Sequence, residues 1–238
     1  MFEQFLKIET ADGVMPTFVV HPERRHAPLV LMLMDGPGMR ETLRDQARRL
    51  ASVGYFVVLP NFYYRKKGPL EDLNLAIPEM RELVHSVTNE RFLADARASL
   101  GAVKDRPEVK RGPIGTIGYC FGGRLALVLA EALGPDLAAA VSLHPGAMVT
   151  AEPGSPHRNL GHVRARVYLG CCEEDAVFPP DAIESFRRAL VTNHVVFESE
   201  VHPGTHHGYS LPDSAGYQRA AAERAWERTF ALFGECLR

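Results

Sequence analysis

Long apolar runs are missing from this sequence, and so are blocks of like charge. No stretch reaches the roughly 18 apolar residues that a helix needs to cross a bilayer. The first ten residues mix charged and apolar side chains instead of forming the apolar core of a secretory signal. The formal net charge is −2 over 238 residues, with both signs interleaved. We therefore expect neither a membrane protein nor a nucleic-acid-binding protein.

Cysteine is scarce, and no zinc-ligand pattern is present. The four cysteines are Cys120, Cys171, Cys172 and Cys236. Their spacing fits neither a disulfide framework nor a zinc knuckle, so we expect a reducing, cytoplasmic setting. The histidines His202, His206 and His207 have no cysteine or carboxylate cluster at ligand spacing, which argues against a metal site.

Strand and helix patterns alternate along the whole chain. Strands are expected at residues 4–8, 15–20, 29–34, 55–59, 114–118, 138–143, 166–169 and 195–201. Helices are expected at residues 40–53, 79–87, 91–104, 121–133, 180–191 and 214–233. This alternation predicts a single α/β domain over residues 1–238, with a mostly parallel central sheet and helices on both faces. In such sheets, ligands bind beyond the carboxyl ends of the strands.

The segment Gly118-Tyr119-Cys120-Phe121-Gly122-Gly123 lies between a predicted strand and a predicted helix. It has the form G-x-S-x-G with cysteine in place of serine. A sharp turn there would lift Cys120 above the sheet and leave no room for side chains two residues before and after it, where the glycines stand. The helix N-terminus would favour the reactive thiolate, so we interpret Cys120 as a nucleophile rather than an inert core cysteine.

A cysteine nucleophile needs a base, commonly a histidine, and often a carboxylate that orients the base. In this architecture the acid and then the histidine follow the nucleophile along the chain. Asp175 follows a predicted strand, and its short side chain suits the turn there better than Glu173 or Glu174. The loop after the last strand carries both His206 and His207, and the spacing alone does not choose between them.

The oxyanion of an acyl-transfer intermediate needs N–H donors. The N–H of Phe121 is one candidate, and Gly36, in the loop after the strand at 29–34, is the natural second donor because Pro37 has none. Asp35 stands at the same strand end. Its carboxylate could keep a nearby thiol neutral at rest, although it could equally serve as a turn residue.

These residues together resemble the dienelactone hydrolase family, and the resemblance covers nearly the whole chain. The elbow around Cys120 is similar to that family's cysteine elbow, and Asp175 falls where the family has its acid. His207-Gly208-Tyr209 resembles its His-Gly-Phe loop, which favours His207 over His206. The resemblance implies an α/β-hydrolase fold, a Cys120–His207–Asp175 triad, an acyl-cysteine intermediate and no cofactor. The implied substrate is a small ester or lactone.

Three departures from the family bear on the substrate. The family commonly has glutamate where Asp35 stands, an arginine near the position of Leu211, and an aspartate at Asn61. Arg81 could match a second arginine of the family. A clamp for a substrate carboxylate is therefore incomplete, and dienelactone itself need not be the substrate.

Tyr63 and His144 could line the substrate pocket, and the loops at residues 61–78 and 145–159 would shape it.

Two other functions also fit the sequence. The departures at Asp35 and Leu211 leave room for a non-catalytic homologue that binds a ligand or partner, and the adjacent Cys171 and Cys172 leave room for a thiol sensor. We expect a monomer or a small homo-oligomer.

Overall fold

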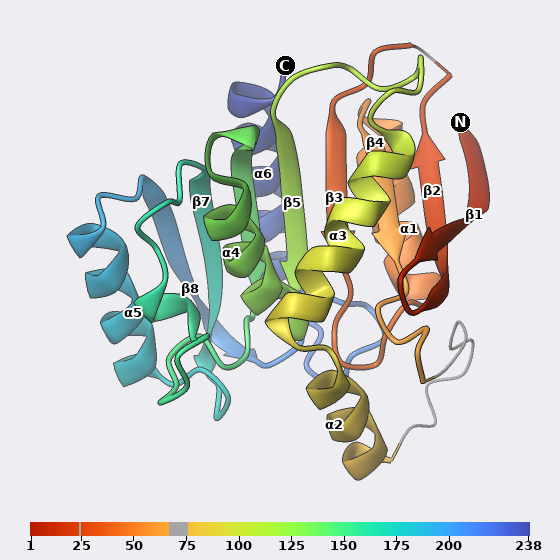
Figure 1. Ribbon diagram of the computed structural model, residues 1–238. Coiled ribbons are helices and arrows are strands. Elements are labelled where there is room, and N and C mark those ends of the chain that lie inside the picture. The colour runs from red at the N-terminus through yellow and green to blue at the C-terminus, as the bar shows by residue number, and fades with distance from the viewer. Residues whose placement is uncertain (24, 67–75) are drawn as a thin grey trace. The chain divides into compact units, whose positions relative to one another are not determined.

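The computed structural model describes residues 1–23, 25–66 and 76–238. Its contacts divide the chain into two units, Met1–Ile114 and Gly115–Arg238. Figure 1 shows the helices and strands of each unit. The expectation of one domain over residues 1–238 stays a prediction.

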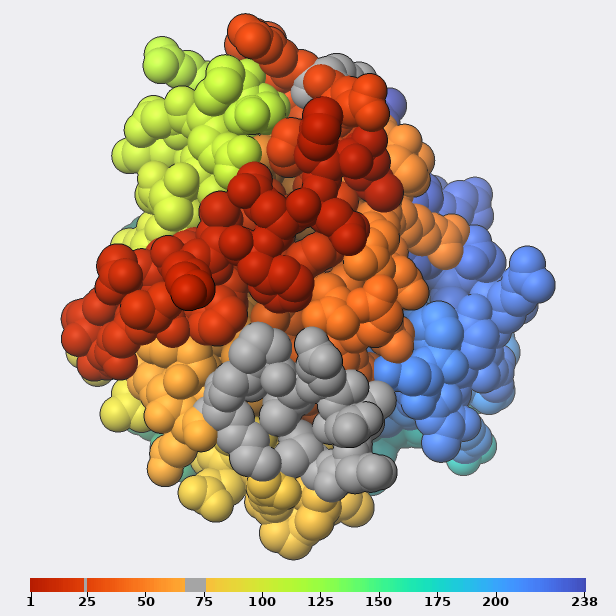
Figure 2. Space-filling model, turned by 90° about the vertical axis from the view of Figure 1, so that its right-hand side faces the viewer, coloured from red at the N-terminus to blue at the C-terminus, as the bar shows by residue number. Residues whose placement is uncertain are grey.

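The first unit opens with a β-hairpin. β1 (Phe2–Thr10) and β2 (Gly13–His21) pair antiparallel along their full lengths. Gly13 has φ +129°, a conformation that side chains rarely adopt, which explains the glycine at this turn. Both strands are longer than the patterns at 4–8 and 15–20, because the ladder continues into exposed residues with no apolar alternation. Figure 2 shows β1 on the outside of this unit.

The strands of the first unit lie in the order β1-β2-β4-β3. β3 (Leu29–Leu33) and β4 (Phe56–Pro60) are parallel to each other, and every residue in them is buried, as their unbroken apolar runs predicted. α1 (Glu41–Ser52) packs against β2 and β4, while α3 (Asn89–Val103) covers the other face (Figure 1). α2 (Ile77–Ser86) precedes α3.

The strands of the second unit lie in the order β5-β6-β7-β8, and β7 is parallel to both β6 and β8. α4 and α5 cover one face and α6 covers the other (Figure 1). The predicted α/β class, with mostly parallel strands and helices on both faces, is confirmed. The elements are β5 (Ile114–Tyr119), α4 (Phe121–Leu133), β6 (Leu137–Leu143), β7 (Arg166–Glu174), α5 (Pro180–Thr192), β8 (Phe197–His206) and α6 (Arg219–Cys236), with short 3-10 turns at Gly134–Asp136 and Pro156–Arg158.

Several boundaries in the second unit differ from the sequence patterns. β7 and β8 extend to Glu174 and His206, because their parallel ladder continues past the last buried alternation. The last helix begins at Arg219 rather than at residue 214. Residues 214–218 form a turn instead, in which the N–H of Tyr217 donates to the carbonyl of Ser214 at 3.0 Å. Within the described ranges, no helix is long and apolar enough to cross a membrane.

Candidate active site

Cys120 occupies a strained turn between β5 and α4. Its backbone has φ +52° and ψ −113°, which is rare for a residue with a side chain. A Cβ at Gly118 would overlap the carbonyl of Gly122, and a Cβ at Gly123 would lie 3.1 Å from Pro145. The strand–turn–helix elbow is therefore present, and at Gly118 the steric reason that the sequence suggested is confirmed.

Hydrogen bonds on both sides of Cys120 hold the elbow. Its N–H donates to the carbonyl of Leu143 at 3.0 Å, and its carbonyl accepts from the N–H of Gly146 at 3.1 Å. Phe121 is the first residue of α4. The N–H groups of a first helical turn have no acceptor within the helix, which is consistent with an oxyanion donor at Phe121, and that role stays a prediction.

His207 and Asp175 form the second part of the site. Nδ1 of His207 lies 2.8 Å from Oδ2 of Asp175, and Oδ1 of the same carboxylate accepts from the N–H of Val177 at 2.8 Å. The Asp175 side chain is 1% exposed and that of His207 is 30% exposed. The buried acid thus holds a histidine that ligands can reach.

The alternative candidates for the base and the acid, which are His206, Glu173 and Glu174, make other contacts. His206 is the last residue of β8 and lies on the surface, 3.6 Å from Glu174. Glu173 accepts from the N–H of Gly204 at 2.7 Å. Only Asp175, of the three acidic candidates, contacts His207 among the described residues.

The positive charge of His207 and the negative charge of Asp175 stabilise each other. Burial opposes protonation of His207, but hydrogen bonds to Asp175 and Cys120 outweigh it and raise the pKa of His207 to about 10. Burial likewise opposes ionisation of Asp175, yet hydrogen bonds from His207 and Val177 bring the pKa of this carboxyl below its usual value. At neutral pH an imidazolium therefore lies between a carboxylate and the sulfur of Cys120.

His144, one of the candidate pocket residues, borders this cluster directly. It follows β6, it is buried, and its ring centroid lies 5.2 Å from that of His207. Its Nε2 is 2.8 Å from Oγ of Ser210. Burial and the neighbouring His207 lower the pKa of His144 to about 3, so this ring is neutral.

The remaining candidates belong to the first unit. Asp35 and Arg40 form a buried ion pair through two contacts of 2.5 and 3.0 Å, so the Asp35 carboxylate already has a cation. The hydroxyl of Tyr63 donates to the carbonyl of Gly36 at 2.7 Å. Arg81 is exposed on α2. Substrate or oxyanion contacts of these residues stay predictions.

The sequence matches the model of one protein family over most of its length. The model of the dienelactone hydrolase family matches residues 15–237. This chain belongs to the dienelactone hydrolase family. The expectation of a hydrolase of the ester or lactone type is thereby confirmed at the level of the family.

Individual members of the family align over nearly the whole chain. A protein from Synechocystis is 27% identical over 87% of this chain and 85% of its own length, and one from Escherichia coli K12 is 28% identical over 96% and 85%. Both are provisionally named carboxymethylenebutenolidases. A Klebsiella pneumoniae crystal structure, provisionally described as a dienelactone hydrolase, superposes with a TM-score of 0.89 at 27% identity and covers 98% of both chains. The expected α/β-hydrolase fold is confirmed.

Two departures from the dienelactone hydrolase pattern have a structural role here. Leu211 is buried, and its N–H donates to the carbonyl of Gly208 at 3.2 Å. Asn61 is also buried, and its side-chain oxygen accepts from the N–H of Tyr63 at 3.1 Å. Neither residue supplies a positive charge. Of the loop at 61–78, residues 67–75 lie outside the described part of the chain.

Two neighbours of the triad had no place in the predicted site, since Ser210 was not singled out and Cys172 was named only for a thiol sensor. Ser210 contacts His144, and the thiol of Cys172 hydrogen bonds to Asp175. Cys171 and Cys172 are successive residues of β7, so their side chains point to opposite faces and do not favour a bond between the two sulfurs. The described ranges contain no group of three or more His, Cys, Asp or Glu side chains that could hold a metal ion.

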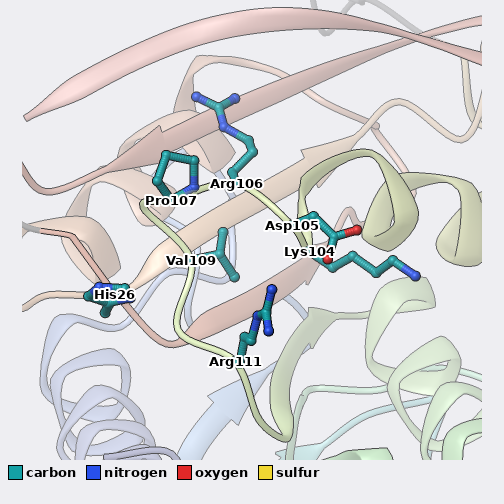
Figure 3. Close-up of a pocket in the computed structure, with 7 residues that line it drawn as sticks. All are labelled: His26, Lys104, Asp105, Arg106, Pro107, Val109 and Arg111. Atoms are coloured by element: carbon teal, nitrogen blue, oxygen red, sulfur yellow. The ribbon is translucent and has the colours of Figure 1, made fainter.

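A separate pocket of about 340 Å³ lies in the first unit, at the end of α3 (Figure 3). Lys104, Asp105 and Arg111 line it, and Arg106 is directed away from them toward the strands. Arg106 already contacts Glu108 and the ring of Phe56. None of the predicted site residues lines this pocket.

Proposed function

We propose that the chain hydrolyses a small-molecule ester or lactone through an acyl-cysteine on Cys120. The observation that carries the proposal is the grouping of Asp175, His207 and the strained Cys120 in one hydrogen-bonded cluster. The names of the curated relatives support a lactone as the substrate class, because a carboxymethylenebutenolidase opens a lactone ring. This chemistry needs no cofactor.

In the first step, His207 holds the proton of the Cys120 thiol, and an electron pair of the resulting thiolate sulfur forms a bond to the carbonyl carbon of the substrate. The electrons of the C=O double bond move to its oxygen, which becomes an oxyanion. The N–H of Phe121 donates to this oxygen, with the N–H of Gly36 as the proposed second donor.

In the second step, the carbon–oxygen single bond breaks and the leaving oxygen takes a proton from His207. A lactone stays attached through its acyl group, whereas a simple ester releases its alcohol. The now neutral His207 accepts a proton from water, whose oxygen attacks the acyl carbon and displaces the Cys120 sulfur. Asp175 orients His207 and stabilises its charged form in each cycle.

Uncharged substrates suit this site best. Leu211, which follows the loop of His207, offers no cation for a substrate carboxylate. We expect an uncharged lactone such as dihydrocoumarin to be opened with a higher kcat/KM than a lactone that bears a carboxylate. The opposite order would show that another residue supplies the carboxylate clamp.

Hydrolysis of p-nitrophenyl acetate tests the nucleophile. We expect Cys120→Ala to abolish activity, while Cys236→Ala, which removes another partly exposed thiol, leaves it unchanged. Iodoacetamide should label Cys120 first, and acyl-enzyme should be visible in the intact mass of rapidly quenched protein. Equal inactivity of wild type and Cys120→Ala, with no labelling of Cys120, would instead support a non-catalytic homologue that binds a ligand or partner.

The two adjacent histidines provide a matched test of the base. His207→Ala should lower kcat by about 10²-fold to 10⁴-fold, the range that proton transfer contributes. His206→Ala should have little effect, because His206 lies on the surface beside Glu174. A larger loss in His206→Ala than in His207→Ala would reverse the assignment.

A further inference from the structure

His144 is held in an unusual backbone conformation directly after β6. It has φ +35°, although it is not glycine, and its N–H donates to the carbonyl of Gly170 at 2.7 Å. A side chain in this region costs of order 1 kcal/mol or more, and it persists only where the surroundings hold it. The residue just before it, Leu143, accepts the N–H of Cys120. His144 therefore belongs to the segment that supports the elbow.

The imidazole of His144 lies against the rings of Tyr119, His207 and Tyr209, and the last two cross it edge to face. The ring of His207 crosses it at 72° with 5.2 Å between centroids, and the ring of Tyr209 crosses it at 77° with 5.5 Å. Both contacts have the edge-to-face geometry that aromatic pairs favour. Ser210 fixes the remaining rotation of the ring through its 2.8 Å contact with Nε2. His144 cannot turn without moving one of these neighbours.

The ring is also chemically suited to lie beside an imidazolium. The ionisable groups that face it are His207, Asp175, Tyr209 and Tyr119, and burial keeps His144 neutral among them. A neutral ring does not repel charged His207, whereas a second cation would. His207 itself has Asp175 on one side, Cys120 on another and His144 against its ring.

We propose that His144 is a positioning residue, whose ring, oriented by Ser210, holds the imidazole of His207 toward Cys120. The proposal rests on the proposed function of the triad, and a direct contact of His144 with substrate is the alternative that the kinetics distinguish. The hydrogen bonds of His207 to Asp175 and Cys120 lie near the plane of the imidazole, so they still permit the ring to tilt out of that plane. Packing against His144 restrains that motion.

Three variants test the proposal in p-nitrophenyl acetate hydrolysis. His144→Ala removes the ring and should lower kcat by about tenfold or more, with KM within about twofold of wild type. His144→Phe keeps a neutral ring and should retain kcat within about threefold. Ser210→Ala should fall between them. Thr229→Val removes a buried hydroxyl on α6 and should leave kinetics unchanged.

The rate at which iodoacetamide alkylates Cys120 provides a second measurement. This rate would not change if the role of His144 were purely structural. The alkylation rate should fall in His144→Ala in parallel with kcat and recover in His144→Phe, while circular dichroism stays that of wild type. Wild-type kcat in both His144→Ala and Ser210→Ala would overturn the proposal, and so would a loss confined to KM, which marks a substrate contact. Failure of the triad itself is distinguishable, because wild type would then be inactive and Cys120 unlabelled.

Discussion

The Nδ1–H group of His207 donates to Oδ2 of Asp175 across 2.8 Å, and the acceptor side chain is almost completely buried. The other oxygen of the carboxylate is occupied by the N–H of Val177. The position of the acid is thus set by the backbone of its own loop, and the position of the histidine is set by the acid.

Asp175→Asn should lower kcat by about 10²-fold to 10⁴-fold while the protein stays folded. The amide can still accept from Val177, but it no longer carries the charge that stabilises protonated His207. Kinetics on p-nitrophenyl acetate and a thermal melt together measure this. Glu174→Gln is the matched control, since this exposed carboxylate contacts His206 instead. Comparable losses in both variants would contradict the assignment of the acid.

Acid should destabilise the protein partly through His144. The pKa of His144 is about 3 in the folded protein, and its ordinary value of 6.5 applies to the unfolded chain. Between these values His144 binds a proton in the unfolded chain but stays neutral in the folded protein. The resulting loss of stability begins as the pH falls through 6.5 and continues toward 3. Between pH 7 and pH 5 it amounts to about 2 kcal/mol. Urea unfolding should show a weaker dependence on pH over this range in His144→Phe than in wild type; identical slopes would contradict it.

The elbow should not tolerate a methyl group at Gly118. Gly118→Ala places a Cβ within the carbonyl group of Gly122, which is backbone and has no rotamer by which to move away. We expect a loss of roughly 3 kcal/mol or more in unfolding free energy, or no folded protein. Gly101→Ala is the control, because its Cβ would meet nothing within 4 Å in α3, and it should stabilise by up to about 1 kcal/mol. Similar melting temperatures for the two variants would be inconsistent with this geometry.

The buried ion pair of Asp35 and Arg40 should matter far more than a surface pair. Arg40→Ala leaves a buried carboxylate without its guanidinium and should cost about 3–5 kcal/mol of unfolding free energy. Arg188→Ala breaks the exposed contact with Glu184 and should cost less than about 1 kcal/mol. Denaturant titrations measure both. A small loss in Arg40→Ala would mean that another group compensates Asp35.

Local sequence patterns predicted the elements well where burial is continuous. The runs that became β3 and β4 are apolar throughout, and both strands are buried along their full length. The helix after the elbow was expected at 121–133 and spans Phe121–Leu133. Boundaries were missed where pairing, rather than composition, decides the length of an element, as in β8, and where a turn precedes the last helix.

The candidate site likewise combines features that neighbouring residues determine with contacts between residues far apart in the sequence. The elbow could be predicted because its glycines and its helix start are neighbours of Cys120. The pairing of Asp175 with His207 could be predicted only as an order along the chain, and the choice over His206 came from the family resemblance. Ser210 and Cys172 carried no usable signal, since each meets its partner only through the packing of separate strands and loops.

By itself, therefore, the sequence determined the alternation of strands and helices and the strained turn at Cys120, because both depend on residues a few positions apart. The tertiary structure decided which histidine reaches the acid and which groups surround it. The parallel ladder between β7 and β8 carries an irregularity between Cys172 and Glu174, so the two strands end out of simple register. That offset places His206 opposite Glu174 and leaves His207 to the loop beyond, where it meets Asp175 and the ring of His144.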